Sequence, residues 1–460
     1  MIIRNLNPGN EIGASAWYVE EGGGRFLLDA GLHPKIDGAG SAPMFDLVDG
    51  DGVDLVAISH CHYDHVAGLP LALRQFPRAR VLMSELSTHV VERVLHNSAN
   101  VMKRQRDEMG ILDYPLYDNQ QVEEISPLFN GVEYRESITC DFARASEHDA
   151  SPQLTFYNAG HTLGAAGIHI KTGSRSLFYT GDCSFQDQTL LKGADFDDIE
   201  ADVLIMETTR GAYDDTRTKV RKKEVHRLRE AIIEVYKRNG SILIPSFALG
   251  RTQEILALLA MMIRDGIIPR QPIYIGGLGK IFTEIYDGLS RKTDRNHQDL
   301  VLARELNLVV HNVEKIRDIR LNTPRIFVVT AGMMNENTVA HEMAIRLSRD
   351  PRHAVFFVGY ADPSTPGGKY RESKMGEPFQ FSSRVQDLVR NCEMRQFDIT
   401  GHANRQELVD WAMKVNPRHL VLAHGDPDSR EWFRARFAEC KASFDVWDPQ
   451  PGETLNLGDF

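Results

Sequence analysis

One run of seven residues restricts the fold and the chemistry of this chain more than any other. Residues 59–65 read Ser-His-Cys-His-Tyr-Asp-His and hold four potential metal ligands in the pattern H-x-H-x-D-H. The run follows the largely apolar stretch 53–58, which is typical of a buried strand, and precedes 66–70, where a helix can begin. It therefore lies on a loop at the carboxyl end of a strand, where α/β proteins tend to place their sites.

The ligand types in this run indicate a metal centre. His60 and His62 are two residues apart on extended backbone, so their side chains point the same way. Asp64 and His65 lie past the bend and can face a second ion. Imidazole and carboxylate ligands without a thiolate favour zinc, with manganese or iron as alternatives. A polar surface loop with scattered histidines is the competing interpretation, and the dense spacing of four ligands argues against it.

The same pattern, a predicted strand that ends at a polar residue, recurs along the chain. The residues at these ends are Asp29, His161, Asp182, Glu207, His402 and His424, after predicted strands near 25–28, 153–158, 176–180, 202–206, 395–399 and 419–423. Asp29 can orient a ligand histidine or can simply form a turn. Asp182 has two carboxylate oxygens and can bridge two ions. The recurrence predicts that these residues share one rim of the fold.

The length and the order of elements predict two α/β domains. A chain of 460 residues is too long for one ordinary core. Between about 241 and 358, apolar strands alternate with amphipathic helices, which favours a parallel sheet with covering helices. We predict a first domain over 1–207, a second domain inserted over 208–395, and a return over 396–460 that completes the first domain.

Charge and cysteine content limit the partners and the compartment. The net charge of −11 does not favour a protein that coats nucleic acid, although residues 210–229 hold eight Lys or Arg against three Asp or Glu. That stretch could contact phosphates or could form a solvated helix face. The five cysteines form no C-x-x-C pair, which favours a reducing compartment. We find no signal peptide and no apolar run long enough for a membrane, so we expect a cytoplasmic protein.

With these residues in order, the chain resembles the β-CASP nucleases of the metallo-β-lactamase fold. That family includes RNase J, the nuclease subunit of the pre-mRNA 3′-end cleavage complex, and Artemis-type DNA nucleases. The matching residues, in order, are Asp29, the run 60–65, Gly160-His161-Thr162-Leu163-Gly164, Gly181-Asp182, Glu207, His402 and His424-Gly425. The stretches 244–251 and 331–334 also resemble the family. The late histidines and the inserted domain narrow the resemblance from the superfamily to β-CASP.

The resemblance implies an αββα sandwich with an inserted β-CASP cap, and an active site in the cleft between them. His60, His62 and His161 would hold one zinc, Asp64, His65 and His424 the other, and Asp182 would bridge the two. Asp64, Glu207 and His402 would be the catalytic residues, with Asp29 behind the ligands. The implied reaction is two-metal hydrolysis of RNA phosphodiester bonds, in which His402, oriented by Glu207, protonates the leaving 3′ oxygen.

The substrate is less closely specified than the metal centre. Candidate substrate-binding residues are Arg210, Arg251, Gly332, Ser364 and Thr365. Arg210 stands where many members have Tyr, and Asn404 where Asp is common. Single-stranded RNA is the expected partner, with DNA as an alternative, and either internal cleavage or 5′ exonuclease action is compatible with the sequence. A homodimer is a family-level expectation.

Two other functions remain open at this point. The first is hydrolysis of a small ester or thioester by the same metal centre, and the inserted domain of roughly 190 residues argues against it. The second is a non-catalytic RNA-binding subunit. Such subunits have lost ligands, whereas every ligand position is filled here.

Overall fold

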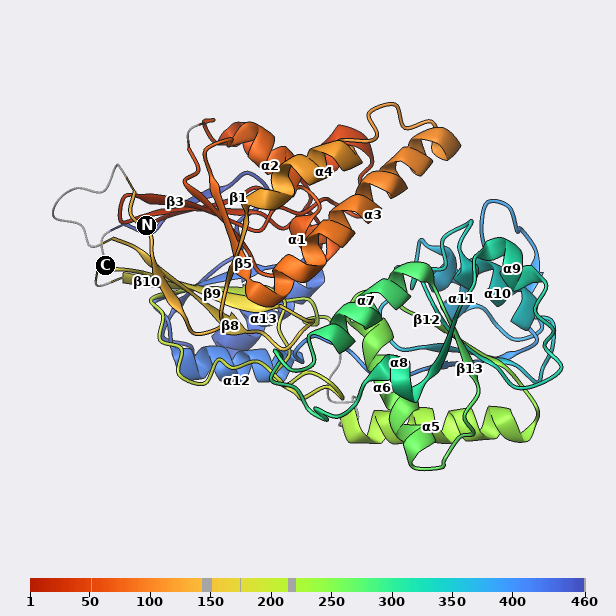
Figure 1. Ribbon diagram of the computed structural model, residues 1–460. Coiled ribbons are helices and arrows are strands. Elements are labelled where there is room, and N and C mark those ends of the chain that lie inside the picture. Colours follow the sequence, from red (N-terminus) through yellow and green to blue (C-terminus); the bar gives the residue numbers. More distant parts are fainter. Residues whose placement is uncertain (51, 143–150, 174, 214–220, 459–460) are drawn as a thin grey trace. The chain divides into compact units, whose positions relative to one another are not determined.

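The computed structural model describes residues 1–50, 52–142, 151–173, 175–213 and 221–458. The chain divides into two compact units (Figure 1). The first unit comprises Met1–Asp187, Gly193–Asp215 and His402–Phe460, and the second comprises Gln188–Lys192 and Thr216–Gly401. The second unit is therefore an insertion, and the chain returns to the first unit at His402.

The first unit is built from two seven-stranded sheets, in the orders β22-β1-β2-β3-β4-β5-β6 and β21-β20-β11-β10-β9-β8-β7. The first contains β1 (Ile2–Asn5), β2 (Trp17–Glu21), β3 (Gly24–Leu28), β4 (Leu55–Ile58), β5 (Arg80–Ser84), β6 (Phe129–Val132) and β22 (Thr454–Asn456). The second contains β7 (Ser137–Thr139), β8 (Gln153–Asn158), β9 (Ala166–Thr172), β10 (Arg175–Tyr179), β11 (Val203–Glu207), β20 (His419–Ala423) and β21 (Asp445–Trp447).

The two sheets face each other across one apolar core. Side chains that alternate along the strands, such as Phe26 and Leu55 from one sheet and Phe156 and Ile205 from the other, are fully buried in it. Helices α1 (Tyr63–Val66), α2 (Leu69–Gln75), α3 (Glu85–Met109) and α4 (Asn119–Ile125) cover the first sheet, while α12 (Arg405–Val415) and α13 (Pro427–Glu439) cover the second (Figure 1). This is the predicted αββα sandwich.

Strand direction brings the predicted polar residues to one edge of the sandwich. β3 and β4 are parallel neighbours, and so are β10, β11 and β20. Asp29 and His60 follow the first pair closely, and Asp182, Glu207 and His424 lie at the ends of the other three strands. Because the carboxyl ends of parallel strands meet at the same edge, residues far apart in sequence converge there.

The second unit is also α/β, as predicted. Its six-stranded sheet has the order β14-β13-β15-β12-β16-β19, and every neighbouring pair is parallel. The strands are β12 (Ile242–Pro245), β13 (Pro272–Ile275), β14 (Asn307–Val310), β15 (Ile326–Val329), β16 (Ala354–Phe357) and β19 (Glu393–Gln396). Helices on both faces (Figure 1) are α5 (Arg221–Lys237), α6 (Arg251–Arg264), α7 (Gly277–Gly288), α8 (Leu302–Glu305), α9 (Val313–Arg317), α10 (Val339–Leu347) and α11 (Pro366–Glu372).

One strand lies in a different sheet from the one expected. The sequence near 395–399 suggested a strand of the first domain that leads to His402. β19 instead pairs with β16 and ends at Gln396, so it belongs to the second unit. Phe397 continues this association, because its N–H donates to Phe357 O at 2.8 Å and its ring contacts Phe356. An apolar pattern predicts a strand but does not say which sheet edge the strand joins.

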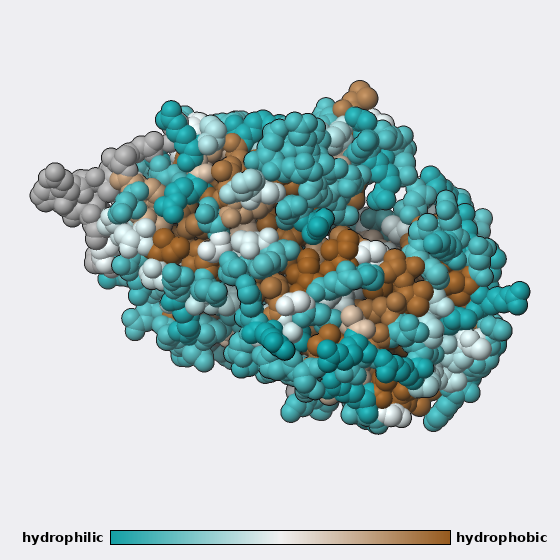
Figure 2. All heavy atoms as spheres, viewed as in Figure 1, coloured by the Kyte–Doolittle hydropathy of each residue, from teal (hydrophilic) through white to brown (hydrophobic). Residues whose placement is uncertain are grey.

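Two further observations concern the chain as a whole. Helix α5 carries part of the basic stretch 210–229, and residues 214–220 of that stretch lie outside the described residues. The visible surface is mostly hydrophilic with some apolar patches (Figure 2), and exposed apolar side chains include Met109 and Leu112. In the described parts of the chain, no helix is long and apolar enough to cross a membrane.

Candidate metal centre

The predicted ligands gather into three adjoining groups in the first unit. The groups are His60, His62, His161 and Asp182; then Asp64, His65 and His424; and finally Asp182, Glu207 and His402. Within each group, one nitrogen or oxygen atom of each residue lies within 4.8 Å of the others. The arrangement joins positions up to 360 residues apart, since His424 Nε2 lies 3.1 Å from Asp64 Oδ2. All nine residues predicted as ligands or catalytic residues are thus in one place.

Asp182 belongs to the first and third groups and also faces two histidines of the second. Its Oδ2 lies 3.6 Å from His60 Nε2 and 3.7 Å from His161 Nε2. Its Oδ1 lies 3.5 Å from His65 Nε2 and 3.0 Å from His424 Nδ1. The side chain is 3% exposed, and its two oxygens face two different sets of histidines. This geometry supports the bridging role predicted for Asp182.

The donor atoms fit a metal ion. Among the described residues, the buried Nε2 atoms of His60 and His65 have no hydrogen-bond partner. Burial, followed by the nearby His65, holds the pKa of His60 well below its usual value, so this imidazole is neutral. Burial alone would raise the pKa of Asp182, but His424 and His65 outweigh it and hold that pKa well below its usual range. Neutral imidazole and ionised carboxylate are the forms that coordinate metals. His60 and Asp182 are therefore in forms that fit a bound metal ion.

Asp29 holds one of these histidines in place. Its carboxylate accepts hydrogen bonds from Ser59 N at 2.6 Å, from Ser59 Oγ at 2.7 Å and from Tyr179 OH at 2.7 Å. It also lies 2.7 Å from His65 Nδ1. Because a carboxylate accepts the proton of Nδ1–H, it leaves His65 Nε2 to face Asp182. Asp29 is fully buried and has a φ of 61°, so its backbone also turns sharply at this point.

A glycine beside Asp29 allows the ligand loop to come close. A Cβ atom at Gly31 would lie 1.8 Å from the backbone oxygen of Asp64. Two hydrogen bonds hold this contact, from Ala30 N to His65 O at 2.8 Å and from Ser15 N to Asp64 O at 2.8 Å. No side chain fits at position 31, so the loop after β3 and the ligand run pack backbone to backbone.

We expect Asp29→Asn to weaken metal binding by roughly 10–100-fold, the usual cost of removing a carboxylate that orients a ligand histidine. The amide nitrogen would face at least one hydrogen-bond donor, either Ser59 N–H or His65 Nδ1–H. Metal affinity can be measured by competition with a chelator. Asp46→Asn makes the same charge change at an exposed position and is the control. Equal affinity in both variants would contradict the orienting role.

The third group contains an acid–base pair. His402 Nδ1 lies 3.1 Å from Glu207 Oε2, and the N–H of Cys183 donates to Glu207 Oε1 at 2.7 Å. Glu207 is 1% exposed, whereas the side chain of His402 is 22% exposed. Glu207 is thus fixed by the backbone, and His402 is the partner that reaches the surface.

Three contacts at the centre escaped the sequence analysis. Ser59 and Tyr179 bind Asp29, and Thr209 Oγ1 lies 3.0 Å from His424 Nδ1. Ser59 is the first residue of the ligand run, directly before His60, and Thr209 lies two residues after Glu207, so their positions were a usable signal. Tyr179 lies in the buried strand β10, where a tyrosine looks like an ordinary core residue.

The candidate substrate-binding residues have different surroundings. Arg210 lies in the first unit, with its guanidinium 4.3 Å from the ring centroid of Tyr213. Arg251 lies in the second unit, is buried, and donates to Ile399 O at 3.0 Å and to Gln188. Burial lowers the pKa of Arg251 to about 10. Arg251 therefore ties together segments of its own unit rather than presenting a cation at the surface.

The remaining three candidates lie on two adjoining loops of the second unit. Gly332 is in the loop after β15, and Gly367 N donates to Met333 O at 2.8 Å. Thr365 Oγ1 accepts from Gly368 N at 3.2 Å and caps α11, and Ser364 Oγ donates to Asp362 Oδ1 at 2.5 Å. Gly332, Ser364 and Thr365 thus belong to neighbouring loops, the two hydroxyls bind their own loop, and the substrate-binding role of all three stays a prediction.

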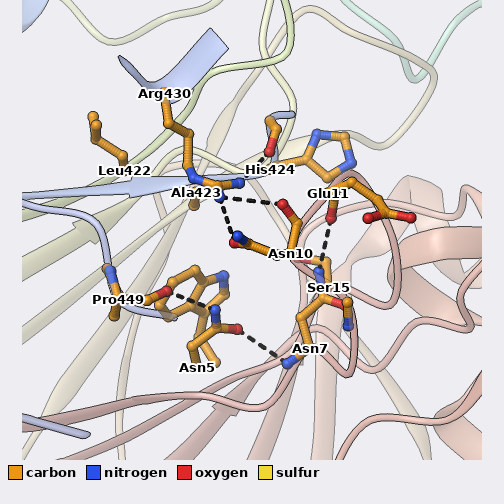
Figure 3. A pocket seen from close by; sticks show the side chains of 13 residues that line it. Asn5, Asn7, Asn10, Glu11, Ser15, Leu422, Ala423, His424, Arg430 and Pro449 are labelled. Atoms are coloured by element: carbon orange, nitrogen blue, oxygen red, sulfur yellow. Dashed lines mark hydrogen bonds between the residues drawn. The ribbon is translucent and has the colours of Figure 1, made fainter. Parts of the chain in front are cut away.

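A polar pocket adjoins the centre at His424 (Figure 3). It is lined by the asparagines of the N-terminal segment, Asn5, Asn7 and Asn10, and by the end of β20. Arg430, which is 7% exposed, crosses it and donates to Gly425 O and to Asn10. Its Nε donates to Asp448 Oδ1 at 2.6 Å. Arg430 thereby fixes the segment that carries His424.

Comparisons with known families cover most of the chain. Residues 9–223 match the metallo-beta-lactamase superfamily, and residues 252–369 match the Beta-Casp domain. Residues 387–447 match the Zn-dependent metallo-hydrolase RNA specificity domain. The three matches follow one another in the order that the two-unit fold shows.

Curated relatives are similar over nearly the whole chain. Cleavage and polyadenylation specificity factor subunit 3 of Dictyostelium discoideum is 26% identical over 99% of this chain and 57% of its own length. Endoribonuclease ysh1 of Schizosaccharomyces pombe is 27% identical, with 97% and 57% covered. Transcription termination factor FttA of Pyrococcus abyssi is 28% identical, with 92% and 66% covered. The chain thus spans 57–66% of the length of these three relatives.

A solved structure has the same fold. It is a protein of unknown function from Enterococcus faecalis V583, with a TM-score of 0.56 and 12% identity over 99% of both chains.

Proposed function

Because the chain belongs to the β-CASP family of the metallo-β-lactamase superfamily, we propose that it is a metal-dependent ribonuclease. The observation that carries this proposal is Asp182, shared between two sets of histidines beside the Glu207–His402 pair. RNA is favoured over DNA because the model matched by residues 387–447 is described as an RNA specificity domain. Internal cleavage is favoured because one relative is named an endoribonuclease.

We further propose that the centre holds two zinc ions. His60, His62 and His161 would bind one ion, and Asp64, His65 and His424 the other, with Asp182 between them. When bound, the ions would act as Lewis acids on a phosphate oxygen and lower the pKa of bound water to about 7. Asp29 would keep His65 Nε2 directed at this site.

The acid–base pair would serve the leaving group. Glu207 holds His402 through Nδ1, so the proton for the departing 3′ oxygen would come from Nε2 of the same ring. Cys183 N–H keeps the Glu207 carboxylate in position while this happens. The complete set of ligands argues against a non-catalytic RNA-binding subunit. The cytoplasmic location and the homodimer stay predictions.

The test is cleavage of a 5′-labelled single-stranded RNA and of its DNA counterpart by the zinc-loaded protein. We expect internal RNA fragments, no product with His62→Ala, and no product after treatment with a chelator. Released mononucleotide would instead indicate 5′ exonuclease action. Intact RNA in the presence of metal-loaded protein would contradict the proposal, and turnover of a thioester by the same sample would identify a small-molecule hydrolase.

A further inference from the structure

Two arginines of the first unit place their guanidinium groups over aromatic rings. The guanidinium of Arg210 is 4.3 Å from the ring centroid of Tyr213, and that of Arg405 is 4.3 Å from the ring centroid of Trp432. Over the described part of the chain, these are the two shortest arginine–ring distances. Tyr213 is 48% exposed, and the other three side chains are half-buried.

These pairs form one cluster. Arg405 Nη1 donates to Gly211 O at 3.0 Å, which joins the second pair to the loop that carries the first. Ala212 N donates to Ser429 Oγ at 3.1 Å, which fixes that loop to α13, the helix that carries Trp432. A Cβ at Gly211 would lie 2.2 Å from Ser429 O, so the contact is close. We call Arg210, Tyr213, Arg405 and Trp432 the arginine–aromatic cluster.

The cluster adjoins the acid–base pair on both sides. Arg210 is three residues after Glu207, and Arg405 is three residues after His402. Glu207 and His402 are themselves in contact at 3.1 Å. Three residues of chain span at most about 11 Å. The backbone of Arg405 is therefore within about 11 Å of that of His402, and the backbone of Arg210 is equally near that of Glu207.

We propose that the arginine–aromatic cluster is a contact surface for unpaired bases of the RNA strand. This inference rests on the proposed function. A guanidinium held on a ring is a rigid cationic plane, on which an unstacked base can lie while in-plane N–H groups donate to phosphate oxygens. Stacking of this kind accepts any base, because every base has a π-face. Bases in a duplex are already stacked, so the surface discriminates against double-stranded RNA.

The test measures binding separately from cleavage. A fluorescein-labelled oligouridine of twelve nucleotides is titrated with the full chain in excess chelator, and fluorescence anisotropy gives the affinity. Arg405→Lys keeps the charge but loses the planar group, and Trp432→Leu removes the ring. We expect each to weaken binding by about tenfold, the scale of one lost stacking contact. Thermal unfolding of every variant checks that it is folded.

A matched control is available in the same unit. Arg135 also lies over a tyrosine, at 5.2 Å from the ring of Tyr157, and its guanidinium binds Asp195 and Asp198. Because none of these residues belongs to the arginine–aromatic cluster, Arg135→Lys should bind oligouridine as the unmodified protein does. We also expect a blunt duplex of the same length to bind more weakly than the single strand, and to be insensitive to Arg405→Lys.

The outcomes separate this inference from the proposed function. The proposed contact surface would be wrong if the folded Arg405→Lys protein bound oligouridine with unchanged affinity. It would also be wrong if this variant lost equal affinity for the duplex and for the single strand. If Trp432→Leu does not fold, Arg405→Lys and Arg210→Lys decide the result. If the cluster binds single strands but the metal-loaded protein cleaves no RNA, the ribonuclease proposal fails and the surface stands.

Discussion

Replacement of Asp182 by Asn is expected to lower metal affinity by more than about 100-fold and to abolish most cleavage of RNA. Removal of a group that merely supports a ligand typically costs 10–100-fold. Replacement of Asp182 should reduce metal affinity further, because its oxygens face His60 and His161 on one side and His65 and His424 on the other. A neutral amide cannot balance cations in both places.

Metal content per chain at a fixed free zinc concentration is the primary measurement, followed by the rate of RNA cleavage. Asp197→Asn is the control, since Asp197 is highly exposed in the same unit and makes the same charge change. Thermal unfolding should accompany both variants, because the histidines around Asp182 are buried. A folded Asp182→Asn protein with full metal content and normal cleavage would remove Asp182 from the centre.

Replacement of His402 by Ala is expected to slow RNA cleavage by about 10²–10⁴-fold while the metal content stays the same. That range is the usual contribution of a positioned general acid. The substitution should slow the hydrolysis of a p-nitrophenyl phosphodiester much less, because its leaving group departs without needing a proton. This difference between substrates identifies an acid rather than a structural residue.

The metal content of the His402→Ala protein decides between two readings of the third group. His402, Glu207 and Asp182 also lie close enough together to hold an ion themselves. If metal is lost in parallel with activity, His402 is a ligand and the acid must be sought elsewhere. His89→Ala, at an exposed position on α3, controls for the general loss of a histidine.

The ligand run could be recognised from sequence because its signals are local. Four ligands within six residues and an apolar strand before them are visible in residues 53–65. The helix was expected to begin after the run, whereas α1 begins within it at Tyr63 and carries Asp64 and His65. The strands that end at Asp29, Asp182 and Glu207 are equally local patterns. The carboxyl ends of neighbouring parallel strands lie at the same edge of a sheet. Local strand patterns that end in polar residues are therefore enough to predict that these residues form one site.

Contacts between distant segments were not predictable in the same way. Tyr179 donates to Asp29 across 150 residues, and Thr209 contacts His424 across 215. The periodicity of the sequence does not specify such partners, because a buried tyrosine or a threonine after a strand can form hydrogen bonds with many different groups. The surroundings of Arg251 could not be predicted from the sequence either. Its position in a family-like stretch suggested substrate, whereas its burial and its bonds to Gln188 and Ile399 became visible only in the folded unit.

The insertion of the second unit also determines when the centre becomes complete during translation. Ribosomal synthesis delivers His60 to Glu207 first, then the 186 residues of 216–401, and only then His402 and His424. A nascent chain that has folded its inserted unit still lacks the proposed proton donor and one ligand. On the proposed function, the growing chain therefore stays inactive on the ribosome until residues 402–424 have been made and have folded onto the first unit.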